Sequence, residues 1–177
     1  QWGFSQFFPA KALCAHVTGW NGAAGVKFRT DVASMCKLGF DIDPARLSAN
    51  ERAFCRQAVA NWRSFAPAVM EGDQHRLVSP HTSNHMAVAY VSKDRGLGVL
   101  FAYDIHPRYD ERPAAVRLEG LDPDRRYRVE EVNLMPGARP SLPAHGRTFT
   151  GDYLMKVGLD VFTGRQMNSR VVRLTAE

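Results

Sequence analysis

The spacing of apolar residues changes near residue 72, and this change limits the folds that the chain can adopt. Before it, apolar residues mostly recur at three- and four-residue intervals, the spacing of helices with one buried face. After it, apolar and polar residues alternate, and turn-forming residues recur roughly every 8–12 positions, as in antiparallel β-sheets. The sequence therefore predicts a mostly helical α/β part over residues 1–72 and an all-β antiparallel sandwich over residues 73–177.

The first part is predicted to hold one strand between two helices. Residues 25–38 have helical spacing, and residues 38–42 are a short apolar run typical of a buried strand. Ser48, followed three positions later by Glu51, predicts a capping box that opens a helix whose apolar stripe ends before Pro67. Helix, strand and helix in this order form half of an alternating α/β architecture.

The second part contains six predicted strands. They cover residues 75–79, 85–93, 97–105, 114–120, 127–134 and 168–176. Between the second and the third, residues 94–96 form a loop suited to a hairpin in which Gly96 adopts a positive φ. The loop 135–146 holds three prolines and two glycines, which disfavour regular structure there.

Two carboxylates, Asp41 and Asp43, follow the predicted buried strand. Their spacing places both side chains on the same side of an extended chain, and glycoside hydrolysis uses such a pair as acid and base or nucleophile. The alternative is structural: Asp43 precedes Pro44 and can close a turn, and Asp41 can cap or pair locally. We favour the structural interpretation and assign no catalytic residue.

Three histidines, His75, His81 and His85, suggest a zinc hypothesis. Their spacing lacks the helical arrangement of HExxH, and the residues around His81 are typical of a loop, so we assign no metal ligand. His16, His106 and His145 are most simply structural. The sequence contains no GxSxG, Walker or GxGxxG motif, and no cofactor-binding residue is assigned.

The cysteines, the charges and the apolar runs argue against a metal site, a nucleic-acid partner and a membrane partner. Cys14, Cys36 and Cys55 are odd in number and lack metal-binding spacing, which predicts buried free thiols. The 23 Lys and Arg residues exceed the 18 Asp and Glu residues, but they are dispersed, which disfavours nucleic-acid binding. No apolar run reaches the ~20 residues of a membrane-spanning helix, so no membrane partner is predicted. The cellular location stays open.

Four segments carry a resemblance to a known family. They are GAAGVKFRTDVASMCKLGFDIDPARLS, QAVANWRSFAPAVMEGDQHRLVSP, VRLEGLDPDRRYRVEEVN and GDYLMKVGL. In this order and at similar spacing they resemble the carboxy-terminal end of family 36 glycoside hydrolases, the bacterial and fungal α-galactosidases. The resemblance covers essentially the whole chain.

The resemblance implies a larger parent enzyme with an amino-terminal domain, a (β/α)8 barrel and a carboxy-terminal β-sandwich. Residues 1–72 would then be the end of the barrel, with its last β/α unit over residues 37–70, and residues 73–177 the sandwich. It also implies hydrolysis of terminal α-galactosides with retention of configuration, two catalytic aspartates, no cofactor, and often a homo-oligomer. The motifs that carry those aspartates are absent here, so we expect the isolated chain to be inactive and structural or interface-forming.

Two alternatives stay open. A stand-alone carbohydrate-binding sandwich with accessory helices would need exposed aromatic residues, for which Tyr103, Tyr109 and Phe149 are candidates. A self-contained hydrolase would combine Asp41 with a carboxylate of the sandwich. On the parent-enzyme interpretation, the outer helices of the barrel leave apolar surface that another layer must cover, and Trp62 and Phe65 are expected to be buried against the second part.

Overall fold

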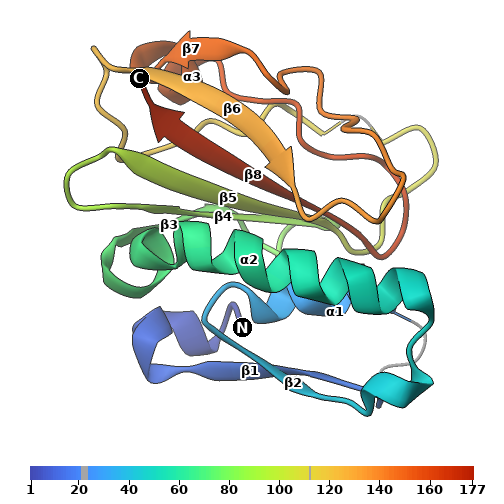
Figure 1. The fold of residues 1–177 in the computed structure, drawn as a ribbon. Coiled ribbons are helices and arrows are strands. Elements are labelled where there is room, and N and C mark those ends of the chain that lie inside the picture. The colour runs from blue at the N-terminus through green and yellow to red at the C-terminus, as the bar shows by residue number, and fades with distance from the viewer. Residues whose placement is uncertain (21–23, 112) are drawn as a thin grey trace.

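Figure 1 shows the computed structural model, which describes residues 1–20, 24–111 and 113–177, as a large sheet above two helices, with a small sheet below them. The helices are η1 (Phe4–Gln6), η2 (Ala10–Ala12), α1 (Val26–Ala33), η3 (Pro44–Arg46), α2 (Ala49–Glu71) and α3 (Gly151–Lys156). The strands are β1 (Cys14–Thr18), β2 (Lys37–Asp41), β3 (Asp73–Val78), β4 (His85–Val91), β5 (Leu97–Asp104), β6 (Arg126–Val132), β7 (Thr148–Thr150) and β8 (Asn168–Ala176).

The large sheet has six strands in the order β3-β4-β5-β8-β6-β7, and every neighbouring pair is antiparallel. Both of its faces are covered. Alternate residues of β4 and β5, such as Val88 and Phe101, pack toward α1 and α2, and the intervening ones, such as Ala89 and Leu100, pack under α3 and the connecting loops. This double burial explains why β4 is buried along its whole length.

The predicted capping box of α2 is confirmed. The Ser48 hydroxyl accepts a hydrogen bond from the backbone N–H of Glu51 (3.2 Å), and the Glu51 carboxylate accepts one from the backbone N–H of Ser48 (2.8 Å). The predicted end of the helix before Pro67 is wrong, because α2 continues to Glu71. Burial of the apolar residues on both sides of Pro67 against the sheet offsets the backbone hydrogen bond that proline removes.

The expected burial of the aromatic residues of α2 against the second part is confirmed for Phe65. Its side chain is fully buried in a cluster with residues of β4, β5 and β8. Trp62 is partly buried against the same cluster, and its indole N–H donates a hydrogen bond to the Cys36 carbonyl (3.1 Å). The helical part and one face of the large sheet therefore share a hydrophobic cluster.

The predicted fold class, a last β/α unit of a TIM barrel followed by a sandwich, is wrong. The described residues contain no barrel unit. They form a small domain dominated by one antiparallel sheet, and β1 and β2 form a separate two-stranded parallel sheet. Nor is β2 buried, since Phe40 is 37% exposed. A short apolar run predicts a strand but does not tell how many strands lie beside it.

Two details of the second part also differ from expectation. Of the predicted strand 114–120, only an isolated bridge between Val116 and Leu159 forms, so loops and α3 make up the layer opposite the helices. Arg95, not Gly96, has the positive φ (57°) in the hairpin between β4 and β5. Side-chain hydrogen bonds within this loop hold that conformation; in one of them the Asp94 carboxylate accepts from the backbone N–H of Gly96 (3.0 Å).

Replacing Gly158 with alanine should destabilise the domain more than the same change at Gly137. Both residues have a positive φ (86° and 81°), which costs a non-glycine residue about 1–2 kcal/mol. Only at Gly158 would the new methyl group also collide with backbone atoms, those of Val116 in the bridge to Leu159. We expect the unfolding free energy of Gly158→Ala to lie below that of Gly137→Ala by at least about 1 kcal/mol in urea titrations. Equal unfolding free energies for the two variants would show that the backbone around Val116 can move to admit the methyl group without a loss of stability.

Candidate functional site

The largest recess near the predicted carboxylate pair lies at the carboxyl ends of β1 and β2. These strands are parallel, so the loops that follow them meet at one edge of the small sheet. The recess has a volume of about 440 Å³, and its polar lining residues are Arg29, Asp41, Asp43, Arg46 and Glu51, with Trp20 beside them. The structure thus brings Asp41 and Asp43 to one site.

The structural interpretation is confirmed for Asp43. Its carboxylate accepts a hydrogen bond from the backbone N–H of Ala45 (2.9 Å) and caps η3, while Arg46 lies 3.8 Å away as an ion-pair partner. Asp41, the last residue of β2, is paired in the strand register with Thr18. Among the residues that the structure describes, its exposed carboxylate makes no hydrogen bond or ion pair, so the predicted local pairing of Asp41 is not found.

The third carboxylate of the recess, that of Glu51, takes part in the capping box at the start of α2. Hydrogen bonds from the backbone N–H and the hydroxyl of Ser48 lower its pKa. A general acid needs the opposite shift, because it must hold its proton near neutral pH. Two of the three carboxylates therefore stabilise helix ends, and the described part of the recess lacks the separated acid and base that hydrolysis requires.

Sequence reasoning missed two residues of this recess, Trp20 and Arg29. Trp20 is 86% exposed at its edge. The Arg29 guanidinium donates a hydrogen bond to the Thr18 carbonyl, and its buried Nε has no partner within the described ranges. The signal available in the sequence was a tryptophan between two residues typical of turns, Gly19 and Asn21, but β1, which places it, was not predicted. An aromatic ring beside charged groups suits a polyhydroxylated ligand better than an apolar one.

The three histidines of the zinc hypothesis lie in different environments. His75 is 3.3 Å from the Glu119 carboxylate, whereas His85 is buried with its Nδ1 2.9 Å from Asp104. His81 lies in the exposed turn after β3. The described residues include no group of three or more His, Cys, Asp or Glu side chains arranged to hold a metal ion.

The prediction of buried thiols holds for one cysteine only. Cys36 is buried, Cys55 is partly exposed, and Cys14 is exposed with its Sγ 3.4 Å from Nε2 of His16. Burial raises the pKa of Cys36 to about 11, which keeps this thiol protonated and unreactive at neutral pH.

The three aromatic candidates for a sugar-binding platform do not act together. Tyr103 is buried, and its hydroxyl donates a hydrogen bond to the Asp31 carbonyl (2.8 Å). Tyr109 is fully exposed in a loop, and Phe149 stacks on Tyr153 with ring centroids 5.1 Å apart. A shared platform of Tyr103, Tyr109 and Phe149 is therefore wrong.

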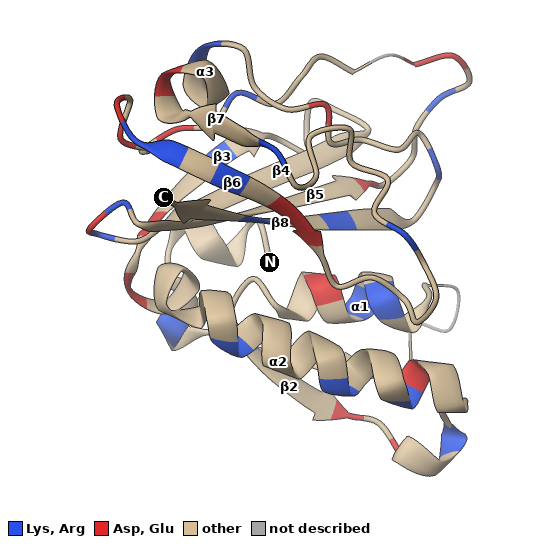
Figure 2. Ribbon diagram, turned by 45° about the horizontal axis from the view of Figure 1, so that its top comes forward, with Lys and Arg blue, Asp and Glu red and all other residues tan. Residues whose placement is uncertain are grey.

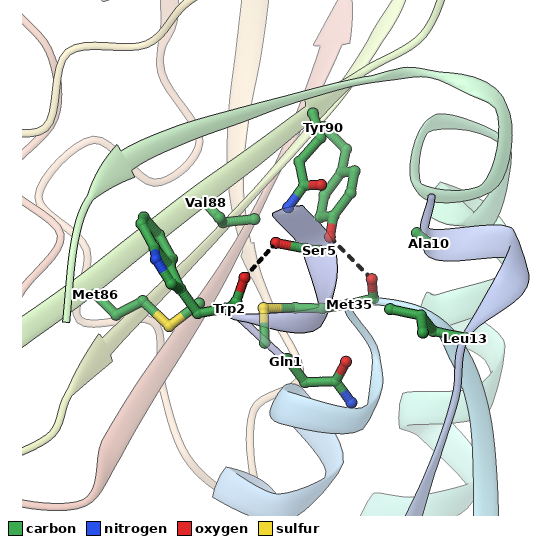
Figure 3. A pocket seen from close by; sticks show the side chains of 10 residues that line it. Gln1, Trp2, Ser5, Ala10, Leu13, Met35, Met86, Val88 and Tyr90 are labelled. Carbon is green, nitrogen blue, oxygen red and sulfur yellow. Dashed lines mark hydrogen bonds between the residues drawn. The ribbon is translucent and has the colours of Figure 1, made fainter. Parts of the chain in front are cut away.

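A small cavity beside the N-terminal segment is almost filled by side chains of the protein itself. Figure 3 shows Trp2 and Met86 lying together in it, with the Tyr90 hydroxyl bonded to the Met35 carbonyl (3.0 Å). The remaining space of about 10 Å³ holds a single water molecule at most. We therefore do not consider it a ligand site.

The surface charges are mixed in sign. Figure 2 shows basic and acidic residues on the same elements, as on β6, where Arg126 and Arg128 are followed by Glu130 and Glu131. Such mixing does not provide the clustered basic face that nucleic-acid binding needs. In the described ranges, no helix has both the length and the apolar character required to cross a membrane.

Comparison with protein families and known proteins gives one consistent result. A family model described as the glycosyl hydrolase family 36 C-terminal domain matches residues 85–174. A probable α-galactosidase G of Aspergillus terreus is 34% identical over 98% of this chain, and α-galactosidase 2 of Hypocrea jecorina is 30% identical over 98%. The chain spans only 23% and 22% of these relatives.

The solved structures agree. The crystal structure of the GH36 α-galactosidase AgaB from Geobacillus stearothermophilus matches the whole chain with a TM-score of 0.85 at 27% identity. The AgaA variant from the same organism, solved in complex with raffinose, matches it with a TM-score of 0.84 at 26% identity. The chain covers 23% and 24% of these two structures.

Proposed function

Because this chain belongs to glycosyl hydrolase family 36, whose C-terminal domain it carries, we propose that it is part of an α-galactosidase that hydrolyses terminal α-galactosides. The observation that carries the proposal is the similarity to α-galactosidases along the whole chain, in both sequence and structure. The chain spans about a quarter of these relatives, which supports a role as one part of a larger enzyme.

The proposed reaction proceeds with retention of configuration and uses two aspartates that lie outside this chain. The carboxylates of the recess at the ends of β1 and β2 support this assignment, since those of Asp43 and Glu51 each accept a backbone hydrogen bond at the start of a helix. Asp41 alone cannot supply both the nucleophile and the acid that a retaining glycosidase requires. On this proposal, the isolated chain is inactive.

The proposed role of this chain is structural, and its partner is the rest of the enzyme. Exposed aromatic side chains in the N-terminal segment support such a partner: Phe4, Phe7 and Phe8, within five residues of one another, are 64%, 81% and 50% exposed, and grouped apolar side chains at a surface mark interaction sites. The division into residues 1–72 and 73–177 stays a prediction; it coincides with the end of α2 at Glu71 and the start of β3 at Asp73.

The test compares the full-length protein that contains this chain with the isolated chain. We expect the full-length protein to release 4-nitrophenol from 4-nitrophenyl α-galactoside and galactose from raffinose, and the isolated chain to release neither. The first galactose observed by proton NMR should be the α-anomer, as retention requires. A full-length protein that leaves α-galactosides intact would overturn the proposal. Activity of the isolated chain, abolished in Asp41→Asn, would instead support a self-contained hydrolase.

A further inference from the structure

A second recess, of about 340 Å³, lies in the sheet-bearing part of the chain, between the loop around Ser141 and the segment that leads into β8. The function proposed above does not use it. Its lining includes the aromatic ring of Phe162. The polar side chains that line it include those of Ser141, Asp160, Thr163, Arg165 and Asn168.

One wall of this recess is fixed by a buried carboxylate. Asp104, which is 2% exposed, accepts hydrogen bonds from the backbone N–H of Thr163 (2.8 Å) and from the Thr163 hydroxyl (2.6 Å). The Asn168 amide donates a further hydrogen bond to the same hydroxyl (2.8 Å). The turn between Phe162 and Asn168 is therefore held in place without a ligand, which lowers the entropic cost of binding.

The opposite wall is fixed by a buried guanidinium. Arg170, 5% exposed, donates hydrogen bonds to the Ser141 hydroxyl (2.6 Å), the Val161 carbonyl (2.7 Å) and the Glu131 carboxylate (3.2 Å). Glu131 in turn accepts a hydrogen bond from the backbone N–H of Ser141 (2.7 Å). Both walls are thus attached to β-strands of the large sheet through charged hydrogen bonds, which are stronger than neutral ones.

The recess contains polar groups that these networks do not use. Within the described ranges, the exposed side chains of Asp160 and Arg165 make no hydrogen bond or ion pair. Phe162 is partly buried and has the His85 ring 4.5 Å from its centroid on one side. The recess therefore offers free acceptors, free donors and an aromatic ring on a rigid frame.

This combination fits a sugar better than an anion. Neighbouring hydroxyl groups donate to a carboxylate and accept from a guanidinium, and the C–H face of a pyranose packs on an aromatic ring. The free charges of the recess, those of Asp160 and Arg165, are opposite in sign and cancel, so the recess has no excess positive charge to attract a phosphate or a carboxylate ligand. We propose that this recess binds a neutral, galactose-containing oligosaccharide through Asp160, Phe162 and Arg165, at a site that has no catalytic role. The choice of galactose rests on the proposed function.

The test is a titration of the ¹⁵N-labelled 177-residue chain with raffinose and with melibiose, followed by NMR. We expect the amide signals of residues 160–168 to shift with both sugars. Asp160→Asn and Arg165→Met should each weaken binding about tenfold, the loss expected when a charged hydrogen-bonding partner is removed. Asp124→Asn and Arg63→Met make the same charge changes at exposed positions outside the recess and should leave the affinity unchanged.

Three outcomes would overturn the inference. They are unchanged signals of residues 160–168 at tens of millimolar sugar, shifts that persist in both recess variants, and equal binding of sucrose, which lacks galactose. Circular dichroism and melting curves of each variant must match those of the unchanged chain, so that loss of binding is not loss of fold. Hydrolysis by the full-length protein is measured separately. Hydrolysis without binding here would remove only this inference, and binding here without hydrolysis would remove only the proposed function.

Discussion

Replacing Asp31 with alanine is expected to lower the free energy of unfolding by about 3–5 kcal/mol, the range observed when one partner of a buried ion pair is removed. The Asp31 side chain is fully buried in α1. Its carboxylate accepts hydrogen bonds from the Lys27 ammonium (2.5 Å), the Ser169 hydroxyl (2.7 Å) and the Asn133 amide (2.8 Å). It thereby ties α1 to β8 and to the residue that follows β6. Urea titration followed by circular dichroism measures the loss.

The size of this effect comes mainly from the Lys27 ammonium, which would lose its counterion in the Asp31→Ala variant. The Lys27 side chain is only 19% exposed and also donates to the Ser169 carbonyl (2.8 Å), so its charge would stay in place without a counterion. Asp152 provides the matched control, because it forms an ion pair with Lys156 at the same spacing but on an exposed helix (2.7 Å). Asp152→Ala should cost no more than about 0.5 kcal/mol. Equal losses in the two variants would contradict the role of Asp31.

Replacing Phe65 with alanine is expected to cost about 3–5 kcal/mol, the range for removing a buried phenylalanine side chain. Phe65 is fully buried between α2 and the large sheet, and its ring meets Phe101 edge to face with centroids 5.8 Å apart. The change should weaken the attachment of α2 to the sheet, and urea and thermal unfolding measure it.

Phe7 is the matched control for this change. It is the same residue type, but 81% of it is exposed, so Phe7→Ala should alter the unfolding free energy of the isolated chain by no more than about 0.5 kcal/mol. Phe65→Leu keeps most of the buried volume and should fall between the two. If Phe65→Ala proves as mild as Phe7→Ala, other contacts hold α2 on the sheet.

Much of the fold could be predicted where local pattern and tertiary environment agree. The sequence predicts β3, β4, β5, β6 and β8 to within a few residues, and also the start of α2 at its capping box. The predictions failed where contacts distant in sequence decide. α2 runs through Pro67 because the sheet buries its far end, and β1 forms because β2 pairs with it.

The candidate sites show the same division. Asp41 and Asp43 could be singled out because they follow a recognisable strand. Their neighbours Trp20 and Arg29 come from other segments, and the meeting of these segments depends on the parallel pairing of β1 with β2. The rigid frame of the second recess was equally hidden, since Asp104 precedes the Thr163 that it holds by 59 positions.

The central place of β8 in the large sheet has a consequence for synthesis of the chain. β8 lies between β5 and β6 and pairs with both along its length, yet it is made after all the other strands that the structure describes (Figure 1). Until residues 168–176 have left the ribosome, β5 and β6 each present an unpaired edge to other nascent chains. We therefore expect this domain to depend on chaperones or fast translation of its last segment, and stop codons within β8 to yield aggregates rather than a shortened folded protein.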